Sequence, residues 1–277
     1  MNRDAAVDAA IRRVEWRERL FGFARPWLRD APGRWADGAP ILLYHDIVGR
    51  GEQPRDPFTV TVDAFDAQMA WLAERFTVVT VRELLARIVR GTAKGVAAVT
   101  FDDGYRSTVA HALPVLRARK IGATVFVDTG RLNSGGRALN DADVRALSDA
   151  GVEIGSHTVT HPNLTELDDA SLRRELSDSR SRLSSLTGAD VVGFAHPFGR
   201  YNTRVNSAVQ AAGYSYACTC RQHRTNLPGD DALQLVRVEV NATDDMRRFE
   251  SKMHGRYAPL YAAWYRLNPE TRAWVDA

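Results

Sequence analysis

Short apolar runs alternate with helix-like segments along most of this 277-residue chain, and this alternation is its strongest constraint on fold. Strand-like runs lie at 41–44, 78–80, 96–101, 123–127, 152–154, 191–195, 215–219 and 235–240, with helix-like segments at 64–75, 81–90, 106–119, 141–150, 168–187 and 202–212. Alternating strands and helices predict a mainly parallel sheet covered by helices. Seven or eight such units fit an open or closed α/β barrel better than a short doubly wound sheet, and no GxGxxG follows the first strand.

Composition and charge are those of an ordinary globular protein. Hydrophobic residues make up 44% and charged residues 26% of the chain, and the formal net charge is +3. So small an excess of positive charge lacks the footprint of a dedicated nucleic-acid binder, and no helix-turn-helix or zinc-finger spacing is present. We therefore expect no nucleic-acid partner.

The first 38 residues differ from the rest, and we divide the chain into an appendage at 1–38 and a catalytic domain at 39–277. The appendage combines arginines with large apolar side chains, among them Trp16 and Trp27. A basic stretch of this kind lies either on an anionic membrane or as a helix against the domain or a partner subunit, and we favour packing. No run of 18 apolar residues and no signal-peptide core is present, which predicts a cytoplasmic, possibly membrane-peripheral, protein of unspecified oligomeric state.

Two adjacent carboxylates follow the strand at 96–101. Asp102 and Asp103 precede Gly104, and Asp-Gly is common in turns, so a structural turn is one interpretation. A turn needs only one of the two carboxylates, and like charges side by side repel unless a cation or a shared proton relieves them. The pair is therefore a candidate functional site.

Two histidines lie four residues apart after the strand at 152–154. His157 and His161 can reach one cation from a single turn or a tight loop, and Pro162 makes a longer helix improbable. Together with Asp103 they supply two imidazoles and one carboxylate, a ligand set that leaves coordination positions open for water and substrate. The sequence thus predicts a metal site formed by Asp103, His157 and His161.

Further polar and aromatic residues follow other strands. His196, Pro197, Phe198 and Tyr201 come after the strand at 191–195, where they either line a sugar-sized ligand or serve as ordinary strand-to-helix packing. His45 and Asp46 follow the first strand. Functional residues of barrels gather where strands end, so all of these are candidates for the site.

Arg237 lies in the last strand-like run, on the same face as Glu239 by strand alternation. If that face is the barrel interior, the guanidinium needs a partner, and Asp102 or Asp46 would meet the need. The alternative is a solvated face of an edge strand.

Three motifs occur in order with strand-like lead-ins: TFDDGY at 100–105, SHTVTH at 156–161 and FAHPFG at 194–199. Together they resemble the polysaccharide deacetylase family, also called the NodB-homology or carbohydrate esterase family 4 group. The leading YHDI and the late VRVEV look like its exopolysaccharide and cell-envelope subgroup. The resemblance covers about residues 40 to 245.

The resemblance implies a distorted (β/α)7 barrel of the polysaccharide deacetylase type with one divalent metal ion, zinc (Zn²⁺) first, with Co²⁺, Ni²⁺ or Mn²⁺ as alternatives. It implies Asp102 as general base and Asp103, His157 and His161 as metal ligands. Asp46, Tyr105, His196, Pro197, Phe198 and Tyr201 are the expected substrate-binding residues. The expected activity is hydrolysis of N-acetyl groups on an amino-sugar glycan or a lipid-linked sugar.

The sequence departs from the family pattern at two points. Many members carry an arginine where this chain has Ala195, and Arg237 is a candidate to replace it. Many members also have a late Leu-x-His motif that supplies the general acid, which is missing here. His45 and His223 are then the candidates for the acid, with His196 third. The alternatives are a hydrolase of another C–N amide or an acetyl ester, and a catalytically degenerate glycan-binding protein.

Overall fold

A parallel sheet forms the centre of the molecule. The computed structural model describes residues 3–28 and 38–267. Its eight-stranded sheet has the order β10-β1-β5-β6-β7-β8-β9, and β4 also pairs with β5. The strands are β1 (Ile41–Tyr44), β4 (Thr77–Val79), β5 (Val96–Phe101), β6 (Ala123–Val127), β7 (Glu153–Ser156), β8 (Gly193–Ala195), β9 (Tyr216–Cys218) and β10 (Val238–Glu239).

The sheet curls until its two edges nearly meet. Cys218 in β9 forms a parallel bridge with Leu235, three residues before β10 begins. The Thr219 N–H donates to the Leu235 carbonyl at 2.8 Å, and the Leu235 N–H donates to the Ala217 carbonyl at 2.9 Å. This arrangement confirms the predicted distorted α/β barrel.

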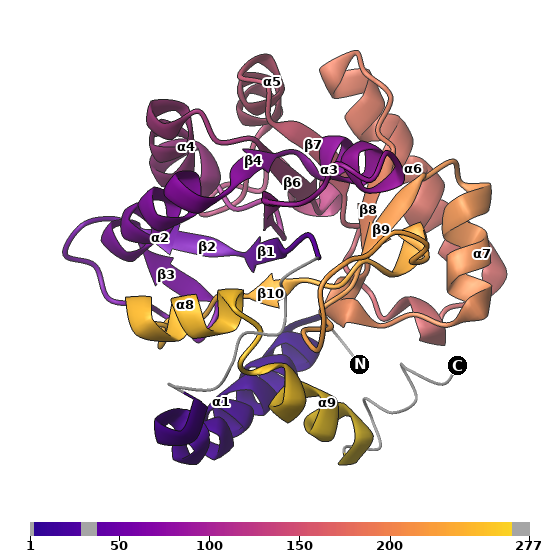
Figure 1. Ribbon diagram of the computed structural model, residues 1–277. Helices are drawn as coiled ribbons and strands as arrows, with labels where there is room; N and C mark the ends of the chain where they lie inside the picture. The colour runs from indigo at the N-terminus through magenta and orange to yellow at the C-terminus, as the bar shows by residue number, and fades with distance from the viewer. Residues whose placement is uncertain (1–2, 29–37, 268–277) are drawn as a thin grey trace.

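Helices cover the outside of this sheet (Figure 1). They are α2 (Val62–Arg75), α3 (Val81–Val89), α4 (Leu113–Arg119), α5 (Asp141–Asp149), α6 (Asp169–Thr187) and α7 (Thr203–Ala211). α6 shows why these segments form helices: the Asp168 side chain caps its first turn, and Gly188 ends it at φ +68°. Its leucines at 172, 176, 183 and 186 are buried in the main core against the sheet.

The structure differs from the sequence-based expectation at two points. The helix predicted at 106–119 consists of a π-helical turn, Thr108–Ala112, followed by α4. A separate parallel pair, β2 (Asp46–Val48) with β3 (Thr59–Thr61), follows β1 and was not predicted. These three-residue strands are too short to show a periodic pattern.

Three helices from the N-terminal and C-terminal parts of the chain meet near β10, with α1 and α9 below this strand and α8 beside it (Figure 1). They are α1 (Arg3–Leu28), α8 (Met246–Met253) and α9 (Ala258–Leu267). The Phe21 ring of α1 lies 5.2 Å from the Tyr261 ring and 6.4 Å from the Trp264 ring of α9. The helix predicted as an appendage therefore packs on the rest of the chain. None of the described helices combines the length and the apolar composition that a membrane span requires.

Candidate active site

Three side chains from two distant segments of the sequence converge beyond the carboxyl ends of β5 and β7. Asp103 follows β5, while His157 and His161 follow β7, and β5 and β7 both pair with β6. The His157 and His161 Nε2 atoms lie 3.6 and 3.4 Å from Oδ1 of Asp103. The two Nε2 atoms are 3.1 Å apart.

These separations suit a single small cation. Zinc bonds to nitrogen and carboxylate oxygen measure about 2.0–2.2 Å, so ligand atoms at tetrahedral angles lie about 3.3–3.6 Å apart. The three observed distances fall near that range. One carboxylate and two imidazoles also leave at least one coordination position for water or substrate, as catalytic metal sites require. The side chains thus fit a divalent metal ion.

A hydrogen bond orients the His157 imidazole, and a backbone hydrogen bond and a ring contact hold His161. Nδ1 of His157 lies 2.7 Å from the Ala195 carbonyl, which fixes the proton on Nδ1 and leaves the Nε2 lone pair facing the site. The backbone N–H of His161 donates to Oγ1 of Thr158 at 2.9 Å. The Phe198 ring packs edge-on against the His161 ring, with centroids 4.5 Å apart. The β8 segment thereby supports both ligands.

The backbone is strained at this site. Positive φ values occur at Asp103 (+69°), Thr158 (+72°), His161 (+56°) and Phe198 (+57°), although none of them is glycine. Only two other non-glycine residues in the described chain, Lys120 and Asn133, share this conformation. Such residues cost free energy and persist where the surrounding structure holds them, commonly at functional sites.

Glu175 in α6 anchors the loop that carries both histidines, and the sequence analysis missed it. Its carboxylate accepts hydrogen bonds from the N–H groups of Val159 at 2.7 Å and Thr160 at 2.9 Å. The Thr160 hydroxyl donates to the same carboxylate at 2.6 Å. A glutamate on a helix carries no sequence signal for this role, because 15 residues separate it from its loop partner Thr160.

Asp102 is buried beside the three candidate ligands and forms a bidentate ion pair with Arg237. Nη1 and Nη2 of Arg237 each lie 2.7 Å from a different Asp102 oxygen. Burial alone would raise the pKa of the Asp102 carboxyl, but the Arg237 charge, followed by His157, outweighs burial and lowers this pKa. Arg237 therefore meets the carboxylate that the alternation in its strand suggested, and Asp102 is held ionised.

A cavity of about 570 Å³ opens onto these groups, a size within the range of small-ligand sites. Asp102, Asp103, His157 and His161 line it, together with predicted residues His45, Asp46, Tyr105 and Phe198. Asp46 forms ion pairs with Arg55 at 3.1 Å and with Arg137 at 2.8 Å. Burial and the nearby Asp103 carboxylate raise the pKa of the Tyr105 hydroxyl, so it stays protonated.

The remaining predicted residues lie elsewhere in the described part of the molecule. His196 is fully buried, and its ring packs between Phe194 and Tyr201, with centroids 5.2 Å from each. Pro197 is buried in the turn that follows, and Tyr201 donates to Gln234 at 3.0 Å. These three residues pack the strand-to-helix connection, which was the alternative interpretation. His223 contacts Tyr265. Among the described residues, the cavity lining includes none of these four: His196, Pro197, Tyr201 and His223.

Other residues line the cavity although the sequence did not mark them. Glu239 of β10 does so, and its position two residues after Arg237 was the available signal. Arg17 of α1 and Trp264 of α9 line it as well. Nothing local in the sequence links these two residues to the metal ligands, which lie more than 80 positions from Arg17 and more than 100 from Trp264.

The fold and the site together define a parallel α/β barrel with an open Asp–His–His metal site and an arginine-paired carboxylate beside it. Residues 90–217 match the model of the polysaccharide deacetylase family. This assignment covers 128 of the 277 residues, includes all three motifs and confirms the resemblance that they predicted.

Named relatives agree with that assignment. YxkH of Bacillus subtilis, named as a polysaccharide deacetylase, is 29% identical over 204 residues, which span 72% of this chain and 71% of that protein. The structure of BC0361, a polysaccharide deacetylase from Bacillus cereus, superposes with a TM-score of 0.70 at 26% identity, covering 78% of this chain and 69% of that one. A chitooligosaccharide deacetylase of Rhizobium leguminosarum is 31% identical over 117 residues, 42% of this chain and 52% of that protein.

Proposed function

We propose that this protein is a metal-dependent hydrolase that removes N-acetyl groups from an amino-sugar glycan or glycoconjugate. The observation that carries the proposal is the convergence of Asp103, His157 and His161 beside the ionised Asp102 in one cavity. The relatives named as polysaccharide and chitooligosaccharide deacetylases indicate the substrate class.

Asp103, His157 and His161 would hold the metal ion, for which zinc is our first candidate. A divalent cation bound there supplies a Lewis acid that lowers the pKa of water and polarises a carbonyl group. The buried position of the two imidazoles strengthens any electrostatic interaction made at the site.

Asp102 acts as the general base in this proposal. Its carboxylate is ionised, and one of its oxygens lies 4.0 Å from Nε2 of His157, within reach of a small molecule at the metal ligands. Arg237 holds both carboxylate oxygens and so fixes the orientation of the base. Asp102 takes the proton of the attacking water, and the backbone N–H of Tyr105 at the cavity rim donates to the developing oxyanion.

His45 is the general acid in this proposal. It lines the cavity together with Asp102 and Glu239 and interacts electrostatically with both carboxylates. Its Nδ1 atom is buried and unpaired among the described residues, so Nε2 is the nitrogen that the cavity can reach. Burial lowers the pKa of His196 to about 3, which leaves that imidazole without a proton to give at neutral pH. His45 then protonates the departing amine.

The cytoplasmic location, the lipid-linked form of the substrate and the peripheral membrane contact inferred from the sequence stay predictions.

The test is acetate release from N-acetylated saccharides by protein loaded with zinc, cobalt, nickel or manganese. We expect His157→Ala to lose both bound metal and activity, because it removes one of three ligands. Asp102→Asn should keep its metal, measured by elemental analysis, while its rate falls by about 10²–10⁴ or more.

Three outcomes would decide against the proposal. Full activity of metal-loaded Asp102→Asn would exclude Asp102 as the base. Release of ammonia, or hydrolysis restricted to acetyl esters, would assign the scaffold to a different substrate. Saccharide binding without acetate release, with each of the metals, would indicate a binding protein.

A further inference from the structure

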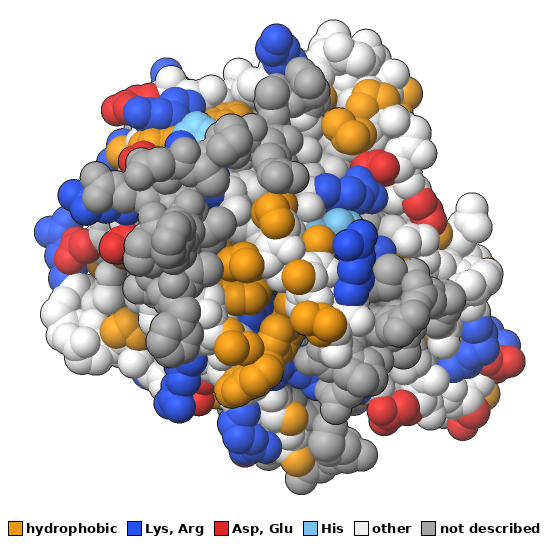
Figure 2. Space-filling view, turned by 60° about the horizontal axis from the view of Figure 1, so that its bottom comes forward, with side chains coloured by type: hydrophobic (Ala, Val, Ile, Leu, Met, Phe, Trp, Pro, Cys, Tyr) orange, Lys and Arg blue, Asp and Glu red, His pale blue; other side chains and the backbone are white. Residues whose placement is uncertain are grey.

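Helix α1 forms part of the wall of the active-site cavity. Ala9, Ile11, Arg13, Val14 and Arg17 of α1 line the same cavity as the metal ligands, and so do two aromatic residues of α9. The two helices contact each other through Trp16 and Trp264, whose ring centroids are 4.9 Å apart. The face turned toward the viewer in Figure 2 carries a central group of hydrophobic side chains with Lys or Arg side chains beside them.

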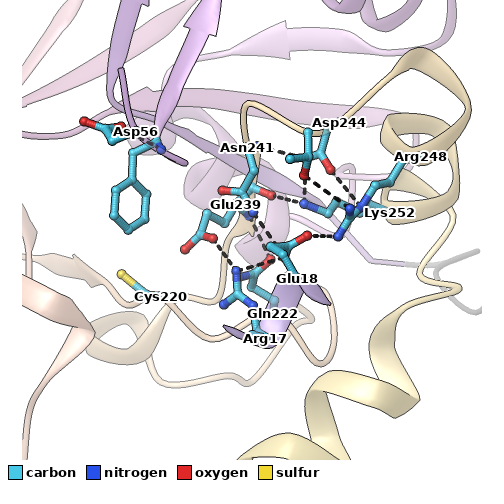
Figure 3. Close-up of polar contacts among 12 residues, drawn as sticks. Arg17, Glu18, Asp56, Cys220, Gln222, Glu239, Asn241, Asp244, Arg248 and Lys252 are labelled. Atoms are coloured by element: carbon cyan, nitrogen blue, oxygen red, sulfur yellow. Dashed lines mark hydrogen bonds and ion pairs between the residues drawn. The ribbon is translucent and has the colours of Figure 1, made fainter. Parts of the chain in front are cut away.

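Buried ion pairs hold α1 in this position (Figure 3). Glu18 pairs with Arg248 of α8 and accepts a hydrogen bond from Asn241 at 3.3 Å. Arg248 also pairs with Asp244 at 2.9 Å, and Lys252 pairs with the same carboxylate at 2.6 Å. Isolated charges are costly to bury, so a paired network of this kind fixes the helix in one register.

The ion pair between Arg17 and Glu239 borders the cavity, whereas the pair between Glu18 and Arg248 lies between α1 and α8. Nη2 of Arg17 lies 2.6 Å from Oε1 of Glu239, and both residues line the cavity. Burial opposes both charges, but their mutual attraction outweighs it, raising the pKa of Arg17 and lowering the pKa of Glu239. Both groups are therefore ionised, and together they are neutral.

The pair keeps hydrogen-bonding capacity for a ligand. Both hydrogen bonds of the Arg17 guanidinium use Nη2, so Nη1 has no partner in the described part of the chain. Oε2 of Glu239 is likewise without a donor among the described residues. A donor and an acceptor side by side match a hydroxyl group, which both accepts and donates. A neutral pair also offers no net charge to attract an anion.

We propose that Arg17 and Glu239 form a subsite that binds hydroxyl groups of the neutral sugar whose acetamido group lies at Asp103, His157 and His161. The subsite makes α1 a specificity element of the enzyme, with Arg17 supplied from outside the family-matched region at 90–217. This inference rests on the proposed function for the placement of the acetamido group.

Calorimetric titration of the metal-loaded, full-length Asp102→Asn protein with N,N′-diacetylchitobiose and with N-acetylglucosamine 1-phosphate tests the subsite. In this background, Arg17→Lys keeps a charge for Glu239 but removes the second guanidinium nitrogen. Glu239→Gln removes the charged acceptor. Each should weaken binding of the neutral disaccharide about 10-fold or more, because hydrogen bonds to charged groups contribute about 1.5–3 kcal/mol.

The matched control is Arg248→Gln on α8, because Glu18 itself pairs with Arg17 at 3.4 Å. Arg248 holds α1 through Glu18 and does not line the cavity, so its substitution should leave saccharide affinity within about 2-fold. Equal losses in Arg248→Gln and Arg17→Lys would show that helix docking alone matters and would overturn the subsite. Unchanged affinity in Arg17→Lys and Glu239→Gln would also overturn it, as would tighter, Arg17-dependent binding of the phosphorylated sugar.

The subsite and the catalytic proposal can fail separately. Binding that depends on Arg17, with no acetate release by the wild-type protein, would refute the activity and retain the subsite. Acetate release that is indifferent to Arg17→Lys in both affinity and KM would refute the subsite and retain the activity.

Discussion

The Asp102–Arg237 pair shows how a single side chain is prepared for chemistry. Both groups are buried, and either one alone would be an uncompensated charge in a low-dielectric interior. Their two-point contact at 2.7 Å leaves the carboxylate ionised and limits its rotation. The arginine lies directly before β10, near the end of the barrel, whereas the third motif carries Ala195. The guanidinium thus comes from a segment outside the three motifs.

Substituting the candidate acid gives the residue-scale prediction. His45→Asn should lower kcat by about 10²–10⁴, because an amine leaves poorly without a proton, and metal content should not change. The matched control is His223→Asn, which removes an imidazole that contacts Tyr265 and should keep near wild-type kcat. Steady-state acetate release with metal analysis measures both. The reverse order of effects would transfer the acid role to His223.

Residue-level inference from the sequence succeeded for the polar groups that follow β5 and β7 and failed for part of the segment that follows β8. Asp102, Asp103, His157 and His161 were predicted to lie together because parallel strands end at one edge of the sheet, and their side chains do so. His196 and Tyr201 follow a strand too, but the chain turns there and buries both. A sequence does not show which way a side chain points once the strand has ended.

At the scale of elements, α6 positions the metal-binding loop through Glu175. We expect Glu175→Ala to weaken metal affinity about 10- to 100-fold, the usual effect of losing a group that orients ligands. The reason is that the Val159 and Thr160 N–H groups lose their acceptor, and the strained φ at Thr158 and His161 then loses support. Competition with a chromogenic metal chelator measures the affinity of each protein for the metal ion.

The control for this element is Asp178→Ala on the exposed face of the same helix. Among the described side chains, Asp178 accepts a hydrogen bond from the Ser177 hydroxyl at 3.1 Å and has no other hydrogen-bond partner, so metal affinity should match that of the wild type. Equal metal affinity in Glu175→Ala and Asp178→Ala would show that the loop holds its geometry without α6.

Elements with clear periodicity were predicted well, and those without it were not. The boundaries of β1, β5 and β6 agree with the apolar runs at 41–44, 96–101 and 123–127. The position of α1 on the barrel could not be predicted, because its contacts with Asn241, α8 and β10 join residues more than 220 positions apart. Its apolar and charged side chains are both used in packing, so the helix lacks a single apolar face.

At the scale of the whole molecule, the two ends of the chain meet beside the active site. α1 and the segment from β10 to α9 together enclose a cavity whose metal ligands come from the middle of the sequence. The catalytic groups therefore depend on the complete fold, and conditions that destabilise the barrel will affect the site.

Acidic pH should destabilise the whole molecule through His196. Burial lowers the pKa of this imidazole from 6.5 to about 3 in the folded state. Above pH 6.5 neither state holds the proton, whereas below it only the unfolded chain gains one, so stability falls as pH falls toward 3. The loss between pH 6.5 and 5 amounts to about 2 kcal/mol for this one group.

The variant His196→Phe isolates this contribution. Phenylalanine suits the aromatic surroundings of Phe194 and Tyr201 and cannot take up a proton. Urea unfolding at pH 7.5 and 5.0 should show a fall in the free energy of unfolding that is about 2 kcal/mol smaller in the variant than in the wild type. Equal falls in the two proteins would mean that this imidazole titrates normally in the folded state, and that the barrel interior near β8 is open to water.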